Sequence, residues 1–255
     1  MEHLLRATAE AEARHFWFHG FRAFVTPLLQ FASRELPRAG IKRILDCGCG
    51  TGANLGLLNQ FGRAYGFDLE PIGVRFARQA GKTLVARATA TAIPFPAETF
   101  DIATSFDVLY SLDDEAEERA LSEMRRVLKP DGFVLINVAA MEMLRGDHSV
   151  LGRELRRYDK SRLRDRVTAA GFTIVRLTYT NVTLFPAMAI VRGYQRWRGL
   201  KPESHATDEI RVPPAPLNLG LTALLLLESL WLRRFNAPAG SSLLCLARKR
   251  AGARS

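Results

Sequence analysis

Short apolar runs recur along the chain and are separated by longer segments in which apolar residues follow helical spacing. A run of four to eight Val, Ile, Leu or Phe residues bounded by turn residues is typical of a buried strand. The strands expected on this basis are residues 42–47, 63–68, 83–88, 100–106, 132–138, 172–180 and 241–249. Their alternation with helical segments predicts an α/β fold with right-handed crossovers and a mostly parallel sheet.

The helical pattern is clearest over residues 115–128, which Asp113 or Asp114 can cap and which the turn residues 129–132 end. The full set of expected helices is 2–36, 52–60, 71–80, 115–128, 161–170, 184–198 and 217–235. Residues 140–160 are polar, so we expect a loop there.

Composition places the chain among globular proteins, because 47% of its 255 residues are hydrophobic and 24% are charged. The net charge of +10 suits an acidic partner, whether nucleic acid, an anionic membrane or a phosphorylated substrate. Cys47, Cys49 and Cys245 show no zinc-ligand spacing, so we expect reduced, buried thiols and no metal. The N-terminal residues lack an uninterrupted apolar stretch, so a cytoplasmic location is expected.

A glycine-rich loop follows the first expected strand and opens a helix, with Gly48, Gly50 and Gly52 at alternate positions. Such glycines let the backbone turn tightly and approach a ligand at the carboxyl end of a sheet. The spacing also fits a permissive dinucleotide fingerprint. However, Asp46 before the glycines would repel a pyrophosphate and suits a ligand ammonium group, which disfavours an NAD(P)-dependent oxidoreductase. Asp68 ends the second expected strand, where it can accept hydrogen bonds from ribose hydroxyls.

Four ordered segments carry a family resemblance: ILDCGCGTG (44–52), YGFDLEP (65–71), IPFPAETFDIATSFDVLYSL (93–112) and MRRVLKPDGFVLINV (124–138). Together they resemble the class I S-adenosylmethionine (SAM)-dependent methyltransferases over roughly residues 40–140. The flanking segments HFWFHGFR and GDHSVLGRELRRYDK are similar to a bacterial, methyltransferase type 11-like subgroup. The resemblance implies a Rossmann-like seven-stranded sheet with an antiparallel last strand, SAM as cofactor and S-adenosylhomocysteine as product.

The resemblance also implies which residues hold the cofactor. Asp46 and the glycine loop would face the methionine part, Asp68 the ribose and Leu69 the adenine. The family commonly has an acidic residue where this chain has Thr89, so the Thr89 hydroxyl or the Ala90 backbone would contact the adenine amino group. The complete expected set is Asp46, Gly48, Cys49, Gly50, Gly52, Asp68, Leu69, Thr89, Ala90 and Phe106.

Candidate catalytic residues follow the fourth and fifth expected strands. His148 is the candidate general base because it lies in the polar loop and has a suitable ordinary pKa. Tyr110 is a second candidate. The candidate substrate residues are His15, Trp17, Asp107, Arg156, Arg157 and Tyr158. Each has a structural alternative: core packing for the first two, helix capping for Asp107, and a solvated charge run for the last three.

We expect one methyltransferase domain over residues 1–255, with a Rossmann-like core at 37–181 and 241–250. Residues 1–36 would form a helical lid and residues 182–240 a helical cap. The apolar stretch 219–232 either packs in the core or lies on a membrane surface as a peripheral contact. In the second case the arginines near lipid phosphates would be Arg192, Arg196, Arg198, Arg233 and Arg234.

The leading functional interpretation is methyl transfer to an oxygen or nitrogen atom of a small molecule, such as an acidic, glycan-linked or lipid-linked metabolite. A nucleic-acid (RNA) methyltransferase is an alternative that the positive charge favours. Against it, residues 104–107 lack an Asn-Pro-Pro-Tyr type motif, and the chain shows no added RNA-binding module. A non-catalytic SAM-binding protein is a third possibility. The oligomeric state is left open.

Overall fold

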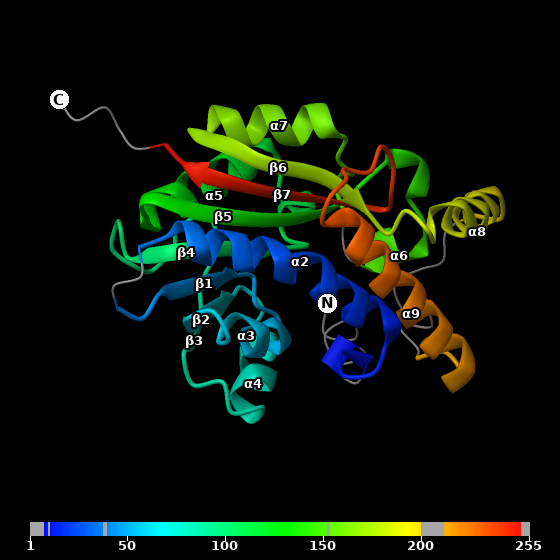
Figure 1. Ribbon diagram of the computed structural model, residues 1–255, viewed down its shortest axis with the longest axis horizontal. Coiled ribbons are helices and arrows are strands. Elements are labelled where there is room, and N and C mark those ends of the chain that lie inside the picture. Colours follow the sequence, from blue (N-terminus) through cyan, green and yellow to red (C-terminus); the bar gives the residue numbers. More distant parts are fainter. Residues whose placement is uncertain (1–7, 10, 38–39, 152–153, 200–211, 251–255) are drawn as a thin grey trace.

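The computed structural model describes residues 8–9, 11–37, 40–151, 154–199 and 212–250 (Figure 1). Their core is a seven-stranded sheet with the order β3-β2-β1-β4-β5-β7-β6. β7 pairs antiparallel with β5 and β6, and the other pairs are parallel, which confirms the expected sheet and its reversed last strand. The strands are β1 (Arg43–Cys47), β2 (Arg63–Asp68), β3 (Val85–Arg87), β4 (Phe100–Phe106), β5 (Leu128–Ala139), β6 (Phe172–Thr180) and β7 (Ser242–Lys249).

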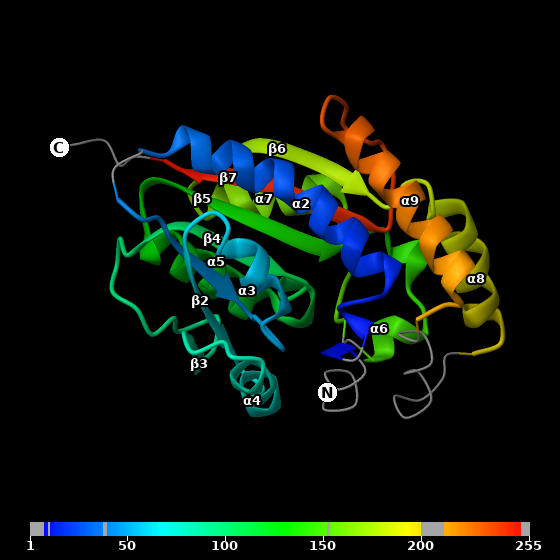
Figure 2. The same cartoon turned by 60° about the horizontal axis from the view of Figure 1, so that its bottom comes forward.

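Helices cover both faces of this sheet (Figures 1 and 2). One face carries α2 (Phe16–Glu35), α3 (Ala53–Leu58) and α4 (Pro71–Gln79), and the other carries α5 (Asp114–Val127) and α7 (Lys160–Ala169). The end toward which β5 points carries α6 (Asp147–Leu151), α8 (Phe185–Trp197) and α9 (Ala215–Leu232). Two 3-10 helices complete the chain, η1 (Leu109–Ser111) and η2 (Glu142–Leu144). The expectation of a loop throughout 140–160 is therefore wrong at η2 and α6.

α5 forms for the reasons that its sequence indicates. The Asp113 side chain caps it by accepting a hydrogen bond from the backbone N of Ala116 at 2.8 Å. Acidic residues occupy its first turn and arginines its last, as the helix dipole favours. Leu121 and Met124 are buried on one face, against the sheet.

The expected helix over residues 2–36 is interrupted at His15, which is the N-cap of α2. Its side chain accepts a hydrogen bond from the backbone N of Trp17, so the chain turns there instead of continuing as one helix. Beyond this point Val25 and Leu29 are fully buried. Residues 16–35 are thus a core helix, and only the segment before them lies at the glycine-rich loop.

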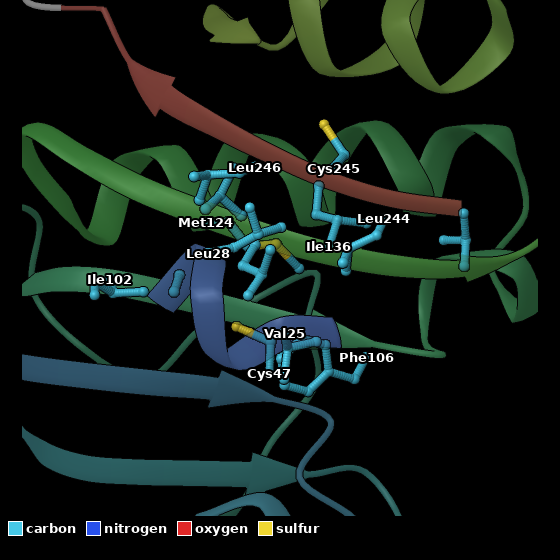
Figure 3. Packing of buried hydrophobic residues seen from close by; sticks show 14 of the residues in the cluster. Val25, Leu28, Cys47, Ile102, Phe106, Met124, Ile136, Leu244, Cys245 and Leu246 are labelled. Atoms are coloured by element: carbon cyan, nitrogen blue, oxygen red, sulfur yellow. The ribbon is translucent and has the colours of Figure 1, made fainter. Parts of the chain in front are cut away.

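The core lies between α2, the sheet and α5 (Figure 3). Figure 3 shows Val25 and Leu28 of α2 with Cys47 of β1 and Phe106 of β4. All three cysteines are free and buried, as expected for reduced thiols, and burial raises the pKa of each.

α9 is long and apolar enough to cross a membrane by length and composition, with a mean hydropathy of 1.5. It is the one such helix in the described part of the chain. It packs along α2, where Gly20 leaves room for Leu225; a Cβ on Gly20 would lie 2.4 Å from a Leu225 methyl carbon. Only 22% of α9 is buried, so core packing accounts for Leu225 and Leu232 but not for most of its apolar residues.

Candidate functional site

The glycine-rich loop connects the carboxyl end of β1 to α3. Gly48 and Gly52 both have φ of +78°, a left-handed conformation that side chains rarely adopt. Gly48 also packs closely: a Cβ there would lie 2.3 Å from a Val108 methyl carbon. The loop is tied to β2, because the backbone N atoms of Gly48 and Cys49 donate to the Phe67 carbonyl at 2.9 and 2.8 Å. The sequence therefore dictates a tight loop beside the tip of β2.

Asp68 ends β2 and faces this loop. Its carboxylate accepts hydrogen bonds from the backbone N of Gly50 at 2.7 Å and of Glu70 at 2.9 Å. Burial raises the pKa of Asp68, which these two amides partly offset. A carboxylate has about four lone pairs, so two can still accept hydroxyl groups. The next residue, Leu69, is 59% exposed and offers an apolar surface of the kind that an adenine ring covers. This pair fits a nucleoside such as that of SAM.

Asp46 lies at the tip of β1 but is only 1% exposed. The Thr104 hydroxyl of β4 donates to it at 2.6 Å. Burial raises the pKa of Asp46 to about 7, and the hydrogen bond from Thr104 opposes that shift. Contact with a ligand ammonium group stays a prediction, because protein encloses most of this carboxylate.

The other expected cofactor residues occupy the same edge. Phe106 ends β4, is buried, and contacts Phe21 of α2 edge to face with ring centroids 4.9 Å apart. The Thr89 and Thr91 hydroxyls are hydrogen-bonded to each other at 2.9 Å, and Ala90 is buried. Adenine recognition by Thr89 and Ala90 stays a prediction.

Asp107 follows Phe106 and is held in an uncommon conformation. Its φ is +61°, its backbone N donates to the Asn137 carbonyl, and the Asn137 side-chain amide donates to its carboxylate, both at 3.0 Å. The residue as a whole has exposed surface, yet burial of its carboxyl raises the pKa to about 7, and Glu154 adds to that shift. A carboxyl with this pKa can exchange a proton at physiological pH.

Asn137 is a residue that sequence reasoning missed. It is a lone amide inside the apolar end of β5, and that break in the pattern was an available signal. Glu154 was also missed. It pairs with Arg157 at 2.9 Å, and both side chains are buried. Arg157 further donates to the Ala140 carbonyl, so this pair supports the surroundings of Asp107.

Tyr110 is buried near Asp107. Burial and the neighbouring carboxylates raise its pKa well above the usual value for a phenol. The phenol therefore stays protonated at physiological pH and cannot serve as a base. A role as a hydrogen-bond donor stays a prediction.

Two of the expected substrate residues face α5 instead. Tyr158 is completely buried, and its hydroxyl donates to Glu117 at 2.9 Å. Arg156 pairs with Glu117 at 3.0 Å and also with Asp114. The expectation that Arg156 and Tyr158 bind substrate is wrong, because their polar groups tie the 154–158 segment to α5.

The remaining candidates are His15, Trp17 and His148. His15 is buried, caps α2 and stacks on Phe16 with ring centroids 4.4 Å apart, so it is not a substrate residue. Burial lowers its pKa. Trp17 is half-buried, and its contact with a substrate stays a prediction. His148 belongs to α6, but its side chain lies outside the described residues.

Glu12 joins the N-terminal segment to the glycine-rich loop. The Thr51 hydroxyl lies 2.7 and 2.6 Å from its two carboxylate oxygens. Arg22 of α2 donates to the Glu12 carbonyl at 3.0 Å. Burial raises the pKa of this carboxyl. Glu12 and Thr51 are 39 positions apart in the sequence, so no local sequence pattern predicts their contact.

Comparison with known proteins agrees with this geometry. Residues 45–136 match the family described as Methyltransferase domain. An uncharacterized protein of Methanocaldococcus jannaschii is 30% identical over 189 residues, which cover 62% of this chain and 73% of that protein. A tRNA (carboxymethyluridine(34)-5-O)-methyltransferase of Arabidopsis thaliana is 35% identical over 134 residues, 52% of this chain but only 32% of that enzyme.

The fold also matches a solved structure. A Thermotoga maritima protein described as a SAM-dependent methyltransferase, possible histamine N-methyltransferase, aligns with a TM-score of 0.59 and 20% identity. The alignment covers 98% of this chain and 100% of that one. The likeness in fold therefore extends well beyond residues 45–136.

Proposed function

Because the chain belongs to the class I SAM-dependent methyltransferases, we propose that it methylates an oxygen or nitrogen atom of a small molecule, with Asp107 as the proton acceptor. The observation that carries this proposal is the combination of solvent exposure and a pKa of about 7 at Asp107, next to Phe106. Sequence reasoning placed the base at His148. Asp107 replaces it here, because its surroundings match that task.

The cofactor supplies a methyl group activated by a sulfonium. The glycine-rich loop would hold its methionine part, Asp68 its ribose hydroxyls and Leu69 its adenine. Leu69 supports this fit, since a largely exposed leucine beside a core strand gains from a covering ring. The protein itself then has two tasks, to orient the acceptor atom and to remove its proton.

Asp107 can perform the second task. At pH 7 about half of its carboxyls are ionised, since its pKa is about 7. Asn137 fixes the carboxylate by donating to one oxygen, which leaves the other free to take the proton that a hydroxyl or amine loses on methylation. Because Asp107 is exposed, that proton can pass to solvent and restore the base.

A small acidic molecule, free or linked to a glycan or lipid, is the substrate class that we propose. Its support is the excess of 36 Lys and Arg over 26 Asp and Glu. Arg157 is near enough to Asp107 to lower the pKa of that carboxyl, although it is already paired with Glu154.

RNA is the second candidate substrate. The Arabidopsis relative is described as acting on tRNA, and the positive charge of this chain suits a phosphate backbone. The matched segment is about a third of that enzyme, so about two thirds of its length has no counterpart in the match.

A methylation screen tests the proposal. Purified protein is incubated with SAM carrying a labelled methyl group and with acidic metabolites, lipid-linked sugars or total tRNA. We expect label on a small-molecule acceptor, and labelling that is about 10²–10⁴-fold slower when Asp107→Asn replaces the wild type. Label on tRNA alone would move the second candidate into first place. Full activity of Asp107→Asn would refute the assignment of the base.

A further inference from the structure

α9 buries two polar residues, Glu228 and Ser229, beside Leu225 and Leu232. Most of its leucines lie outside, and Leu219 and Leu227 are 71% and 64% exposed. Glu228 accepts hydrogen bonds from the backbone N atoms of Val182 and Thr183, both at 2.9 Å. A helix that buries its carboxylate against the protein and exposes leucines on its outer face is suited to an apolar environment at that outer face.

α8 repeats this arrangement at the same end of the molecule (Figure 2). Trp197 is 82% exposed, and Ile190 and Tyr194 are exposed as well, while Gln195 is buried. Trp and Tyr are the residues that concentrate where a bilayer meets water, because their rings are apolar and their N–H or O–H groups are polar. We name the exposed residues of the two helices the α8–α9 surface: Ile190, Val191, Tyr194, Trp197, Leu217, Leu219, Leu224, Leu226, Leu227, Leu230 and Trp231.

Within α8 and α9 themselves, the exposed charges are positive. Within residues 185–197 and 215–232 the single acidic residue is Glu228, which is buried. Arg233 and Arg234 directly follow α9 and are exposed. Arg196 of α8 is exposed and donates to the Met143 carbonyl, a neutral partner that leaves its positive charge uncompensated. An apolar face bordered by arginines complements a bilayer with anionic lipids.

We propose that the α8–α9 surface docks on an anionic membrane as a peripheral contact. A second copy of the chain or a protein partner would also cover leucines, but the bordering arginines would then need matching carboxylates, and the described residues of α8 and α9 expose none. Self-association through this face is therefore disfavoured by like charges. The bilayer supplies both the apolar layer and the phosphates.

α9 lies on the membrane and does not cross it. Its Asn218 accepts a hydrogen bond from the backbone N of Phe16 at 2.9 Å and donates to the Arg14 carbonyl at 2.8 Å. Leu225 packs against Gly20 of α2, and Glu228 holds the start of α8. Crossing the bilayer would break all of these contacts and would carry the Glu228 charge into hydrocarbon.

A chain of hydrogen bonds connects α9 to the cofactor loop. Asn218 of α9 holds residues 14 and 16, and Glu12 in the same segment holds Thr51 of the glycine-rich loop. A substrate with a lipid tail could then reach the site without leaving the membrane. This inference goes beyond the proposed function and does not depend on it, because docking requires no methyl transfer.

Vesicle co-flotation without SAM tests the inference. The full chain is mixed with phosphatidylcholine vesicles that contain none or about 30% phosphatidylglycerol. We expect flotation with the anionic vesicles, weakened by high salt, and an at least tenfold loss for Leu219→Gln/Leu227→Gln. Ile41→Gln is the matched control, since Ile41 is 81% exposed but lies before β1, and it should float like the wild type.

A charge reversal tests the arginines. Arg233→Glu/Arg234→Glu should lose binding to anionic vesicles, whereas Arg34→Glu/Arg164→Glu, with the same change in net charge elsewhere, should retain it. Calorimetric binding of S-adenosylhomocysteine by each variant reports that it is folded. Absence of wild-type flotation would overturn the inference, and so would equal flotation of all variants. A dimer in light scattering that Leu219→Gln/Leu227→Gln dissociates, without flotation, would assign the surface to a second copy.

Discussion

Asp46 and Asp107 lie at the carboxyl ends of two neighbouring parallel strands, β1 and β4. Each has a pKa raised to about 7. Each is also held by a side chain across a strand pair, Asp46 by Thr104 and Asp107 by Asn137. They differ in access. Asp46 is enclosed, whereas Asp107 is exposed and has a φ of +61°.

This difference separates a structural carboxyl from a reactive one. Burial alone is enough to raise a pKa toward neutrality, so a raised pKa does not identify a base. A base must also reach a substrate proton, and only Asp107 of the two meets that condition. The backbone strain at Asp107 points the same way, because such conformations persist where the surroundings enforce them.

Removing each carboxylate in turn tests whether Asp107 is the general base and Asp46 is not. Asp107→Asn keeps the size of the side chain and its hydrogen-bonding capacity but cannot accept a proton. We expect methyl transfer to fall by about 10²–10⁴-fold, the usual contribution of a general base. Binding of S-adenosylhomocysteine, measured by calorimetry, should change less than twofold. Loss of binding together with activity would show that Asp107 serves the cofactor instead.

Asp46→Asn should act on stability with a defined pH dependence. The folded pKa of Asp46 is about 7 against an ordinary value of 3.8, so the folded protein binds this proton more tightly than the unfolded chain. The free energy of unfolding therefore decreases as pH rises from about 4 to 7 and is constant above. An asparagine does not ionise, so residue 46 then contributes no decrease in the free energy of unfolding in this pH range. Asp46→Asn should match the wild type near pH 4 and exceed it by up to about 4 kcal/mol at pH 8.

Denaturant unfolding at both pH values measures this effect. Asp107→Asn should show a pH dependence of the same sign, because the pKa of Asp107 is also raised to about 7. A wild-type advantage over Asp46→Asn at pH 8 would mean that an ionised Asp46 has a stabilising partner in the folded protein.

Asp68→Ala tests the cofactor half of the site. It removes the acceptors expected for the ribose hydroxyls and should weaken S-adenosylhomocysteine binding by about 1.5–3 kcal/mol. Because Asp68 also accepts from Gly50, Asp68→Asn serves as a second variant that keeps an acceptor for that amide. If the folded alanine variant bound the ligand as the wild type does, the ribose assignment would be incorrect.

The smallest effect is expected at Thr51→Val. This change keeps the shape of the side chain and removes the hydrogen bond to Glu12. Loss of one such bond costs about 1 kcal/mol, so S-adenosylhomocysteine affinity should fall by about fivefold if the N-terminal segment supports the loop. Thr168→Val is the matched control, because the Thr168 hydroxyl donates to the Arg164 carbonyl within α7. Equal effects of both substitutions would remove Glu12 from the site.

Patterns along the chain were enough to predict the sheet. Buried parallel strands need continuous apolar runs, and the expected 63–68, 100–106 and 172–180 coincide with β2, β4 and β6. The helix break at His15 was not predictable in the same way, because it depends on a cap and on Asn218 from α9, 202 positions away. Short helices within 140–160 lack enough residues for a periodic signal.

In the candidate site, too, local features could be predicted and long-range contacts could not. The glycine-rich loop and Asp68 could be predicted because one short segment contains their chemistry. The setting of Asp107 could not, since Asn137 and Glu154 approach it only through the folded sheet and the 154–158 segment. Tyr158 was misassigned for the converse reason. Its sequence neighbours are arginines, but its partner Glu117 lies in α5.

Nuclear magnetic resonance titration of the aspartate carboxyl carbons tests the central claim directly and requires no substrate. Spectra of the wild type, Asp46→Asn and Asp107→Asn assign the two signals. The account predicts two aspartates that titrate near pH 7, one of which disappears in each variant. An Asp107 signal that titrates near pH 4 would contradict it, because a carboxyl fully ionised at such low pH would be a poor base at neutral pH.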